Sequence, residues 1–210
     1  MMNLVTAFRP DQWAQHIALN GQQRSLLSAN NSRWLSQIVR SQRQGRTCLP
    51  YFLGLSTVDY HWMMHRQLLG RQRRMPLVSL WNQGHDAPLH EEDLRQQLLE
   101  MRKDEWLEIR NLLRQNKAGK NDCELIMSDI VAAGCLGGDH LWRDLGLQSR
   151  SELSQLMLQN FPTLAAANSG DMKWKKFFYK QLCEAGGGYV CRAPSCDQCS
   201  AYSDCFGPEE

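Results

Sequence analysis

Four of the eight cysteines fall within the last twenty residues of this 210-residue chain, in the pattern C-x4-C-x2-C-x5-C formed by Cys191, Cys196, Cys199 and Cys205. Thiolates bind soft or borderline metals, and short loops allow several sulfur atoms to converge on one centre. Structural zinc sites usually pair two short knuckles across a longer insert, whereas this segment has a single C-x2-C pair. The first three cysteines have the spacing of plant-type ferredoxins, which place their fourth far downstream. The pattern predicts a metal site, with an iron–sulfur cluster favoured over zinc, and structural or redox thiols as a third interpretation.

The residues next to these cysteines also suit a cluster. The Gly186–Gly188 run and Pro194 allow the backbone to approach a metal centre closely, and backbone N–H groups near cluster sulfurs tune its potential. Lys173, Lys176 and Lys180 precede them at a spacing of three and four residues, which places them on one helix face. A cluster held by four thiolates is anionic, so ammonium groups nearby would stabilise it. The alternative is a solvated lysine face.

The composition and the lack of a recognisable secretion signal predict that these thiols lie in a reducing compartment. Apolar residues make up 42% of the chain and charged residues 22%, which is typical of a soluble protein. The start of the chain shows no basic segment followed by an apolar stretch, and no apolar run is long enough to cross a membrane. We therefore expect a cytoplasmic protein, in which clustered cysteines more often bind metal than form disulfides.

The charge is distributed unevenly along the chain. Residues 1–85 contain ten arginines, two acidic residues and no lysine, for a net charge of +8. Residues 122–210 contain seven basic and twelve acidic residues, for a net charge of −5. An arginine-rich half can bind nucleic acid, an acidic partner or an oxyanion, or it can be a solvated surface. The alternative function is therefore a zinc-stabilised all-α interaction module that binds nucleic acid or an acidic partner.

The elements that must position the cysteines are predicted to be helices. No segment shows sustained apolar alternation, and no Asn-Gly or Asp-Gly hairpin turn occurs. Apolar residues recur at three- and four-residue spacing in six segments, namely residues 24–44, 57–69, 94–113, 123–134, 151–161 and 172–184. The fold class is therefore predicted to be all-α, a compact bundle of six to eight helices with a C-terminal cysteine-rich loop. Residues 1–185 would form the helical domain, and residues 186–210 a metal-cluster tail packed on it.

Several boundaries can be predicted in more detail. Ser56 and Asp171 are candidate N-caps, and Pro162 should stop or kink a helix near position 161. The segment of about 70–92 has few periodic apolar residues and is expected to be loose. Residues 94–113 are predicted to form one helix whose apolar stripe is buried, and this stripe comprises Leu94, Leu98, Met101, Ile109 and Leu112.

From Cys135 onward the chain resembles the NifQ family of nitrogen-fixation proteins. The resemblance is carried by Cys135-Leu-Gly-Gly-Asp-His-Leu-Trp-Arg-Asp-Leu-Gly-Leu147, Phe161-Pro-Thr-Leu-Ala165, Asn168, Met172-Lys-Trp-Lys-Lys-Phe-Phe-Tyr-Lys-Gln-Leu-Cys183 and the four-cysteine tail followed by Phe206-Gly207. It covers about 75 residues strongly. The first 120 or so match more loosely, mainly through residues 49–55.

The resemblance implies a role beyond what the composition indicates. Proteins similar to this family carry a molybdenum–iron–sulfur cluster and supply molybdenum during assembly of the nitrogenase iron–molybdenum cofactor. The chain would then be a carrier without turnover of its own. Its implied partners are the cofactor scaffold complex (NifEN), the nitrogenase iron protein (NifH) and molybdate or another molybdenum source, with no nucleic acid or membrane. No nucleotide- or flavin-binding motif points to an enzyme.

The resemblance also implies which residues hold the metals. The ligands would be Cys191, Cys196, Cys199 and Cys205, on a cluster of the 3Fe-4S or 4Fe-4S type with a position open for molybdenum. His140 lies in the resembling segment close to Cys135, and it is predicted as a further ligand or as a hydrogen-bond donor to one. Lys173, Lys176 and Lys180 are predicted to draw molybdate toward the otherwise acidic tail.

Overall fold

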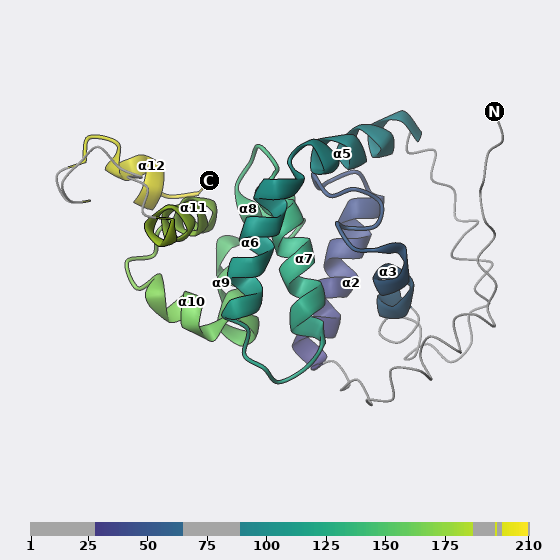
Figure 1. Cartoon of the computed structure of the whole chain (residues 1–210), viewed down its shortest axis with the longest axis horizontal. Helices are drawn as coiled ribbons and strands as arrows, with labels where there is room; N and C mark the ends of the chain where they lie inside the picture. The colour runs from purple at the N-terminus through teal and green to yellow at the C-terminus, as the bar shows by residue number, and fades with distance from the viewer. Residues whose placement is uncertain (1–27, 65–88, 187–195, 197–198, 210) are drawn as a thin grey trace.

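The computed structural model describes residues 28–64, 89–186, 196 and 199–209 (Figure 1). These segments contain ten helices and no strand, so the predicted all-α class is confirmed. The helices are α2 (Ala29–Arg43), α3 (Thr57–Met63), α5 (Leu89–Met101), α6 (Lys103–Gln115), α7 (Cys123–Cys135), α8 (Leu141–Asp144), α9 (Arg150–Asn160), α10 (Pro162–Ala167), α11 (Trp174–Ala185) and α12 (Tyr202–Phe206). The number is above six to eight because one expected helix is divided and the short α8, α10 and α12 were not among the six expected segments. Among the described helices, none is long and apolar enough to cross a membrane.

Serine side chains fix the starts of three helices. Ser56 is confirmed as the N-cap of α3, since its hydroxyl accepts a hydrogen bond from the Asp59 amide at 3.1 Å. Ser28 caps α2 in the same way, so this helix begins at Ala29. Ser149 caps α9, which begins one residue before the predicted position 151. The predicted parts at 24–27 and 65–69 lie outside the described residues, as does the expected loose segment up to position 88, after which α5 begins.

The expected single helix over residues 94–113 is wrong, because α5 ends at Met101 and α6 begins at Lys103. Arg102 stands at the break, where its guanidinium donates to the Leu136 carbonyl at 2.6 Å and pairs with Glu105 at 2.7 Å. This hydrogen bond lowers the pKa of Glu105. Arg102 thus ties the break to the end of α7.

The division changes which apolar residues are buried. Leu94, Leu98 and Met101 on α5 have exposed fractions of 46%, 56% and 82%, whereas Ile109 on α6 is fully buried. The predicted buried stripe is therefore wrong for its first three residues and holds for Ile109. α5 lies across one end of the bundle (Figure 1), while α6 packs along α7.

Truncating leucines from the two helices should separate a buried contact from an exposed one. Leu113→Ala should lower the free energy of unfolding by about 2–5 kcal/mol, because Leu113 is fully buried. Leu98→Ala should change it by about 0.5 kcal/mol or less, because that side chain is mostly in water. Urea denaturation of both variants measures the difference, and equal losses would contradict the assigned burial.

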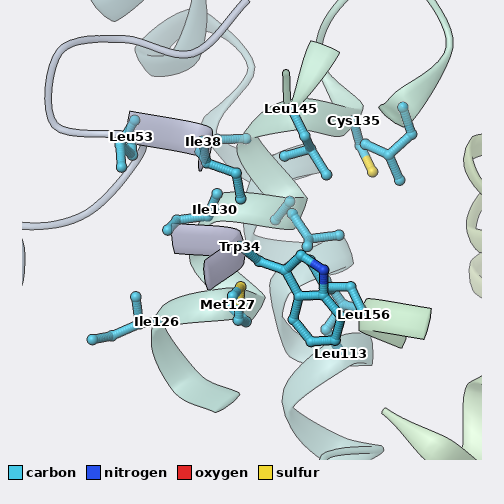
Figure 2. Close-up of a cluster of buried hydrophobic side chains, with 14 of the residues drawn as sticks. Trp34, Ile38, Leu53, Leu113, Ile126, Met127, Ile130, Cys135, Leu145 and Leu156 are labelled. Atoms are coloured by element: carbon cyan, nitrogen blue, oxygen red, sulfur yellow. The ribbon is translucent and has the colours of Figure 1, made fainter. Parts of the chain in front are cut away.

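The core is centred on α7, which is buried along almost its whole length between α2, α6 and α9 (Figure 2). Trp34 and Ile38 of α2 meet Leu113 of α6 and Met127 of α7 there, and all four side chains are buried. The close approach of the chain before α3 to α7 requires Gly54. Its φ is +80°, and a Cβ at this position would lie 2.7 Å from the Ala133 side chain.

The C-terminal helices reach the tail through a short turn. Pro162 ends α9 as predicted and occupies the first position of α10. Asp171 does not cap the last long helix, which begins at Trp174. Instead, the Asn168 side chain exchanges two hydrogen bonds of 2.9 Å with the backbone of Met172. This turn fixes the start of α11, against which the tail packs.

Candidate metal centre

Three of the four predicted cysteine ligands lie in the described part of the tail, and Cys191 lies outside it. Cys199 donates its amide to the Cys196 carbonyl at 3.1 Å, so these two residues share one turn. Tyr202 donates in turn to Cys199 at 3.1 Å and begins α12, which carries Cys205. All three thiols are half-buried. Successive turns therefore gather soft donors in a short segment, as a cluster requires.

The described residues do not by themselves form a finished ligand set. Within these segments, no group of three or more His, Cys, Asp or Glu side chains is close enough to hold a metal ion. Thiols that are half-buried, on consecutive turns and close to the surface nevertheless have the chemistry that an iron–sulfur centre needs. The donor types thus fit the predicted group.

Three of the other described cysteines have raised pKa values. Burial raises the pKa of Cys48 to about 12, and it raises the pKa values of Cys123 and Cys135 as well. These thiols remain protonated at neutral pH and are poor metal ligands. Cys123 and Cys135 belong to the buried core and act as small packing residues.

The start of α11 holds the tail through its backbone and a lysine. The Lys173 amide donates to the Cys205 carbonyl at 2.7 Å, and its ammonium donates to the Ser203 carbonyl at 3.2 Å. The Phe206 ring stacks on Tyr202 with centroids 4.5 Å apart, and it packs against the core together with Cys205. α12 accordingly lies beside α11 (Figure 1).

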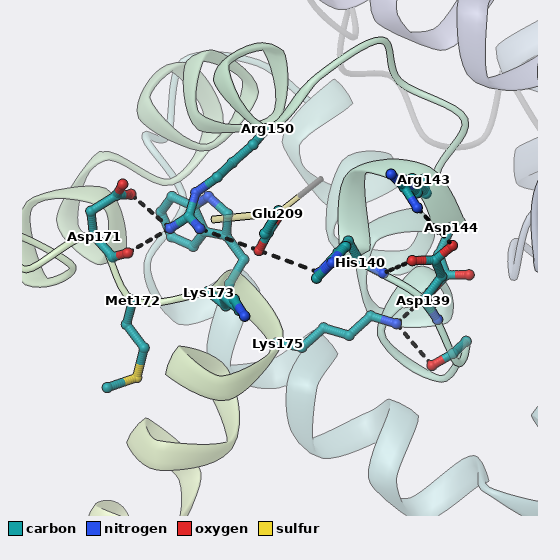
Figure 3. Close-up of polar contacts among 12 residues, drawn as sticks. Asp139, His140, Arg143, Asp144, Arg150, Asp171, Met172, Lys173, Lys175 and Glu209 are labelled. Atoms are coloured by element: carbon teal, nitrogen blue, oxygen red, sulfur yellow. Dashed lines mark hydrogen bonds and ion pairs between the residues drawn. The ribbon is translucent and has the colours of Figure 1, made fainter. Parts of the chain in front are cut away.

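A chain of charged groups fastens the end of the tail, and we call it the Glu209 latch (Figure 3). The Glu209 side chain is only 4% exposed, and it lies 3.3 Å from Arg150 and 3.7 Å from Nδ1 of His140. Arg150 also bonds Asp171 at 2.9 Å. A carboxylate that is nearly buried requires such partners. The latch joins α8, α9 and the turn before α11 to the last residues of the tail.

The latch includes the histidine that the sequence singled out. His140 Nδ1 faces Glu209 rather than a described cysteine, and its residue precedes α8 as the N-cap. The structure thus connects His140 to the tail through a carboxylate. Its role as a metal ligand stays a prediction.

The three predicted lysines are in different surroundings. Lys173 contacts the tail, Lys176 is exposed, and Lys180 lies 3.7 Å from Glu184 one turn along α11. Among the described residues of this face, Lys173 is therefore the lysine that contacts the tail. Attraction of molybdate by the whole face stays a prediction.

Lys175, which helical spacing did not single out, makes a more buried contact than the three predicted lysines do. Its ammonium donates to the Asp144 carboxylate and, at 2.8 Å, to the Gly137 carbonyl. The two paired side chains are 17% and 8% exposed. Asp144 also accepts the Asp139 amide at 3.0 Å, and a Cβ at Gly137 would collide with the carboxylate. The Gly-Gly-Asp-His sequence within residues 135–147 is the signal for this tightly packed loop.

Weakening the latch should loosen the tail without unfolding the bundle. In Glu209→Gln, the Lys173 amide that bonds Cys205 should exchange its hydrogen about tenfold faster, because Arg150 and His140 lose their carboxylate partner. Hydrogen exchange followed by mass spectrometry measures this. Glu184→Gln, which removes an exposed pair with Lys180, is the matched control. Equal exchange in the two variants would show that Glu209 does not hold the tail.

The sequence of this chain is similar to that of a known protein family. The model of the NifQ family matches residues 34–207, which is most of the chain and includes the four tail cysteines. Protein NifQ of Azotobacter vinelandii is 54% identical over 181 residues, covering 85% of this chain and 89% of that protein. Protein NifQ of Klebsiella pneumoniae is 39% identical over 178 residues, covering 82% and 96%.

A further relative matches over a shorter region. The Protein NifQ homolog of Sinorhizobium fredii is 47% identical over 102 residues, covering 49% of this chain and 44% of that protein. No solved structure matches the fold significantly. The family match over residues 34–207 and the two long alignments establish the classification. This chain belongs to the NifQ family of nitrogen-fixation proteins.

Proposed function

We propose that this chain holds an iron–sulfur cluster through Cys191, Cys196, Cys199 and Cys205, and that it carries molybdenum on this cluster for assembly of the nitrogenase iron–molybdenum cofactor. The observation that carries the proposal is the contrast between two kinds of cysteine. Cys196, Cys199 and Cys205 are half-buried on consecutive turns, whereas Cys123 and Cys135 within the bundle are buried and protonated.

The tail residues supply the ligands, and the cluster supplies sulfides on which molybdenum is held. The short turns at Cys196 and Cys199 allow their thiolates to approach one centre from adjacent positions. Half-burial excludes part of the solvent while leaving the tail within reach of a partner. A carrier needs both properties, since its cargo must be held and then released.

The charges around the tail support an anionic cargo. Glu209 is neutralised by Arg150, so it adds little repulsion. The Lys173 ammonium lies at the Ser203 carbonyl, one residue before Asp204 on α12. Salt screens exposed charges beyond about 8 Å under physiological conditions. A cation that contacts the tail therefore attracts an anion to it more strongly than distant cations do.

The receiving partner in this proposal is the nitrogenase cofactor scaffold complex working with the nitrogenase iron protein, in the cytoplasm. The chain itself performs no turnover, because it delivers a bound metal rather than converting a substrate. The Glu209 latch supports this mode of delivery, since a tail fastened by a few polar contacts can be displaced by a partner.

A transfer experiment tests the donation step. The chain is loaded anaerobically with radiolabelled molybdenum, freed of unbound metal, and mixed with the scaffold complex and the iron protein. We expect the label to move to the scaffold complex and to yield a cofactor that activates nitrogenase lacking it. Free molybdate at the same concentration is the control. If the loaded chain transferred no more label than free molybdate, donation by this chain would be refuted.

A further inference from the structure

Two adjoining cavities open near the loop that precedes α8. Their volumes are about 520 and 480 Å³, and both are lined by Arg46, Asp139 and Arg143. Arg40 of α2 lines the first cavity, and Arg95 of α5 lines the second. Four arginines from distant parts of the sequence thus line these two adjoining cavities, which we together call the arginine cleft.

The acidic residues at the cleft do not cancel this charge. Asp139 pairs with Arg143 only at 3.8 Å, and the two side chains are 52% and 41% exposed. Such exposed pairs contribute little and are easily replaced by another anion. Asp144 is already neutralised by Lys175, which also holds the Gly137 carbonyl. The cleft therefore keeps a net positive charge.

A tryptophan that lines the cleft carries a hydrogen-bond donor that is unpaired among the described residues. The Trp142 indole lines the larger cavity, and its buried Nε1 has no hydrogen-bond partner in the described part of the chain. Buried donors are normally paired, so this one needs an acceptor. The Arg143 guanidinium lies 4.9 Å from the Trp142 ring centroid, which holds both groups at the same place. By contrast, the Ser41 hydroxyl already donates to the Gly146 carbonyl at 2.9 Å.

We propose that the arginine cleft binds a tetrahedral oxyanion. Guanidinium groups match the paired oxygens of such ions, and Arg46 and Arg143 are available from both cavities. The cleft is larger than one such ion, which leaves room for bridging water. Molybdate and phosphate share this chemistry and are the two sources to be distinguished.

If the bound ion is molybdate, the position of the cleft links it to the proposed cluster site. Gly137 and Asp144 line the cleft, and Lys175 of α11 bonds both of them. Between them in sequence, His140 faces Glu209 of the tail (Figure 3). One short loop thus borders the oxyanion site and contacts the cysteine tail. The inference that the cleft supplies molybdate to the cluster rests on the proposed function. Oxyanion binding by the cleft does not.

Equilibrium dialysis with radiolabelled molybdate tests the site. We expect saturable binding to the full chain, and an affinity at least about tenfold lower in Arg46→Gln/Arg143→Gln. The charge-matched control is Lys117→Gln/Lys120→Gln, two exposed lysines outside the cleft, which should bind as the parent does. Arg46→Lys/Arg143→Lys keeps the charge and loses the guanidinium fork, so its affinity should fall between the two. Thermal melts confirm that each variant is folded.

The same measurement in Cys196→Ala/Cys199→Ala separates this inference from the proposed function, since no cluster can form there. Binding should persist in that variant. Unsaturable binding to the full chain, or an equal loss in the arginine and lysine variants, would overturn the oxyanion site. Competition then distinguishes the sources, and we expect phosphate to displace molybdate only at much higher concentration. Displacement by phosphate at equal concentration would overturn the assignment to molybdate.

Discussion

Replacing Cys196 and Cys199 with Ala should reduce the iron and acid-labile sulfide of the anaerobically purified chain to background. The two residues share one turn, and their loss removes half of the proposed ligand set. Two remaining thiolates cannot hold a cluster against solvent and competing thiols. The helical domain should stay folded, because the bundle core is formed by other residues. Iron and sulfide assays beside a thermal melt of the metal-free forms measure both effects.

The control for this experiment also removes two thiols. Cys48 and Cys183 are half-buried like the tail cysteines but lie outside the motif. Cys48→Ala/Cys183→Ala should keep the iron and sulfide content of the parent. Unchanged iron in the tail variant, or an equal loss in the control, would refute the assignment of the ligands.

Lys175→Met should lower the free energy of unfolding by about 3–5 kcal/mol, because it leaves a nearly buried carboxylate without its charged partner. The Asp139 amide still donates to Asp144 at 3.0 Å, but one neutral hydrogen bond does not replace an ammonium group. The Gly137 carbonyl loses a donor as well. Urea denaturation of the metal-free chain measures the loss.

Two further variants make the result specific. Lys176→Met changes the exposed neighbour on α11 and should alter stability by about 0.5 kcal/mol or less. Asp144→Asn in the Lys175→Met background removes the orphaned charge and should recover part of the loss. Similar stability in the Lys175 and Lys176 variants would mean that the ion pair is not a support of the loop at residues 137–144.

The sequence predicted local features of the fold well. Ser56 caps α3 and Pro162 starts α10, because hydroxyl capping and the missing proline N–H act within one turn. The division at Arg102 could not be read in the same way. The apolar spacing runs through it, and the contact that Arg102 makes there is with the carbonyl of Leu136, which is distant in sequence. Nor could spacing distinguish the exposed Leu98 from the buried Ile109.

The candidate site shows the same limit. The cysteine spacing is local and identified the tail, whereas the contacts that fasten the tail join residues far apart in sequence. Helical spacing selected Lys173, Lys176 and Lys180 as one face, yet packing gave the most buried ammonium to Lys175. The charge of the arginines in residues 1–85 is compatible with oxyanion binding. Only the fold places Arg40 and Arg46 beside Arg143.

Metal and sulfide analysis with EPR on the full chain, purified without air from cells supplied with iron, zinc and molybdate, tests the central claim most directly. We expect a brown protein with about three to four irons per chain, a similar amount of acid-labile sulfide, an EPR signal from the cluster, and molybdenum. A colourless protein that contains about one zinc per chain and neither iron nor sulfide would contradict the proposal, and it would favour a zinc-stabilised helical module instead.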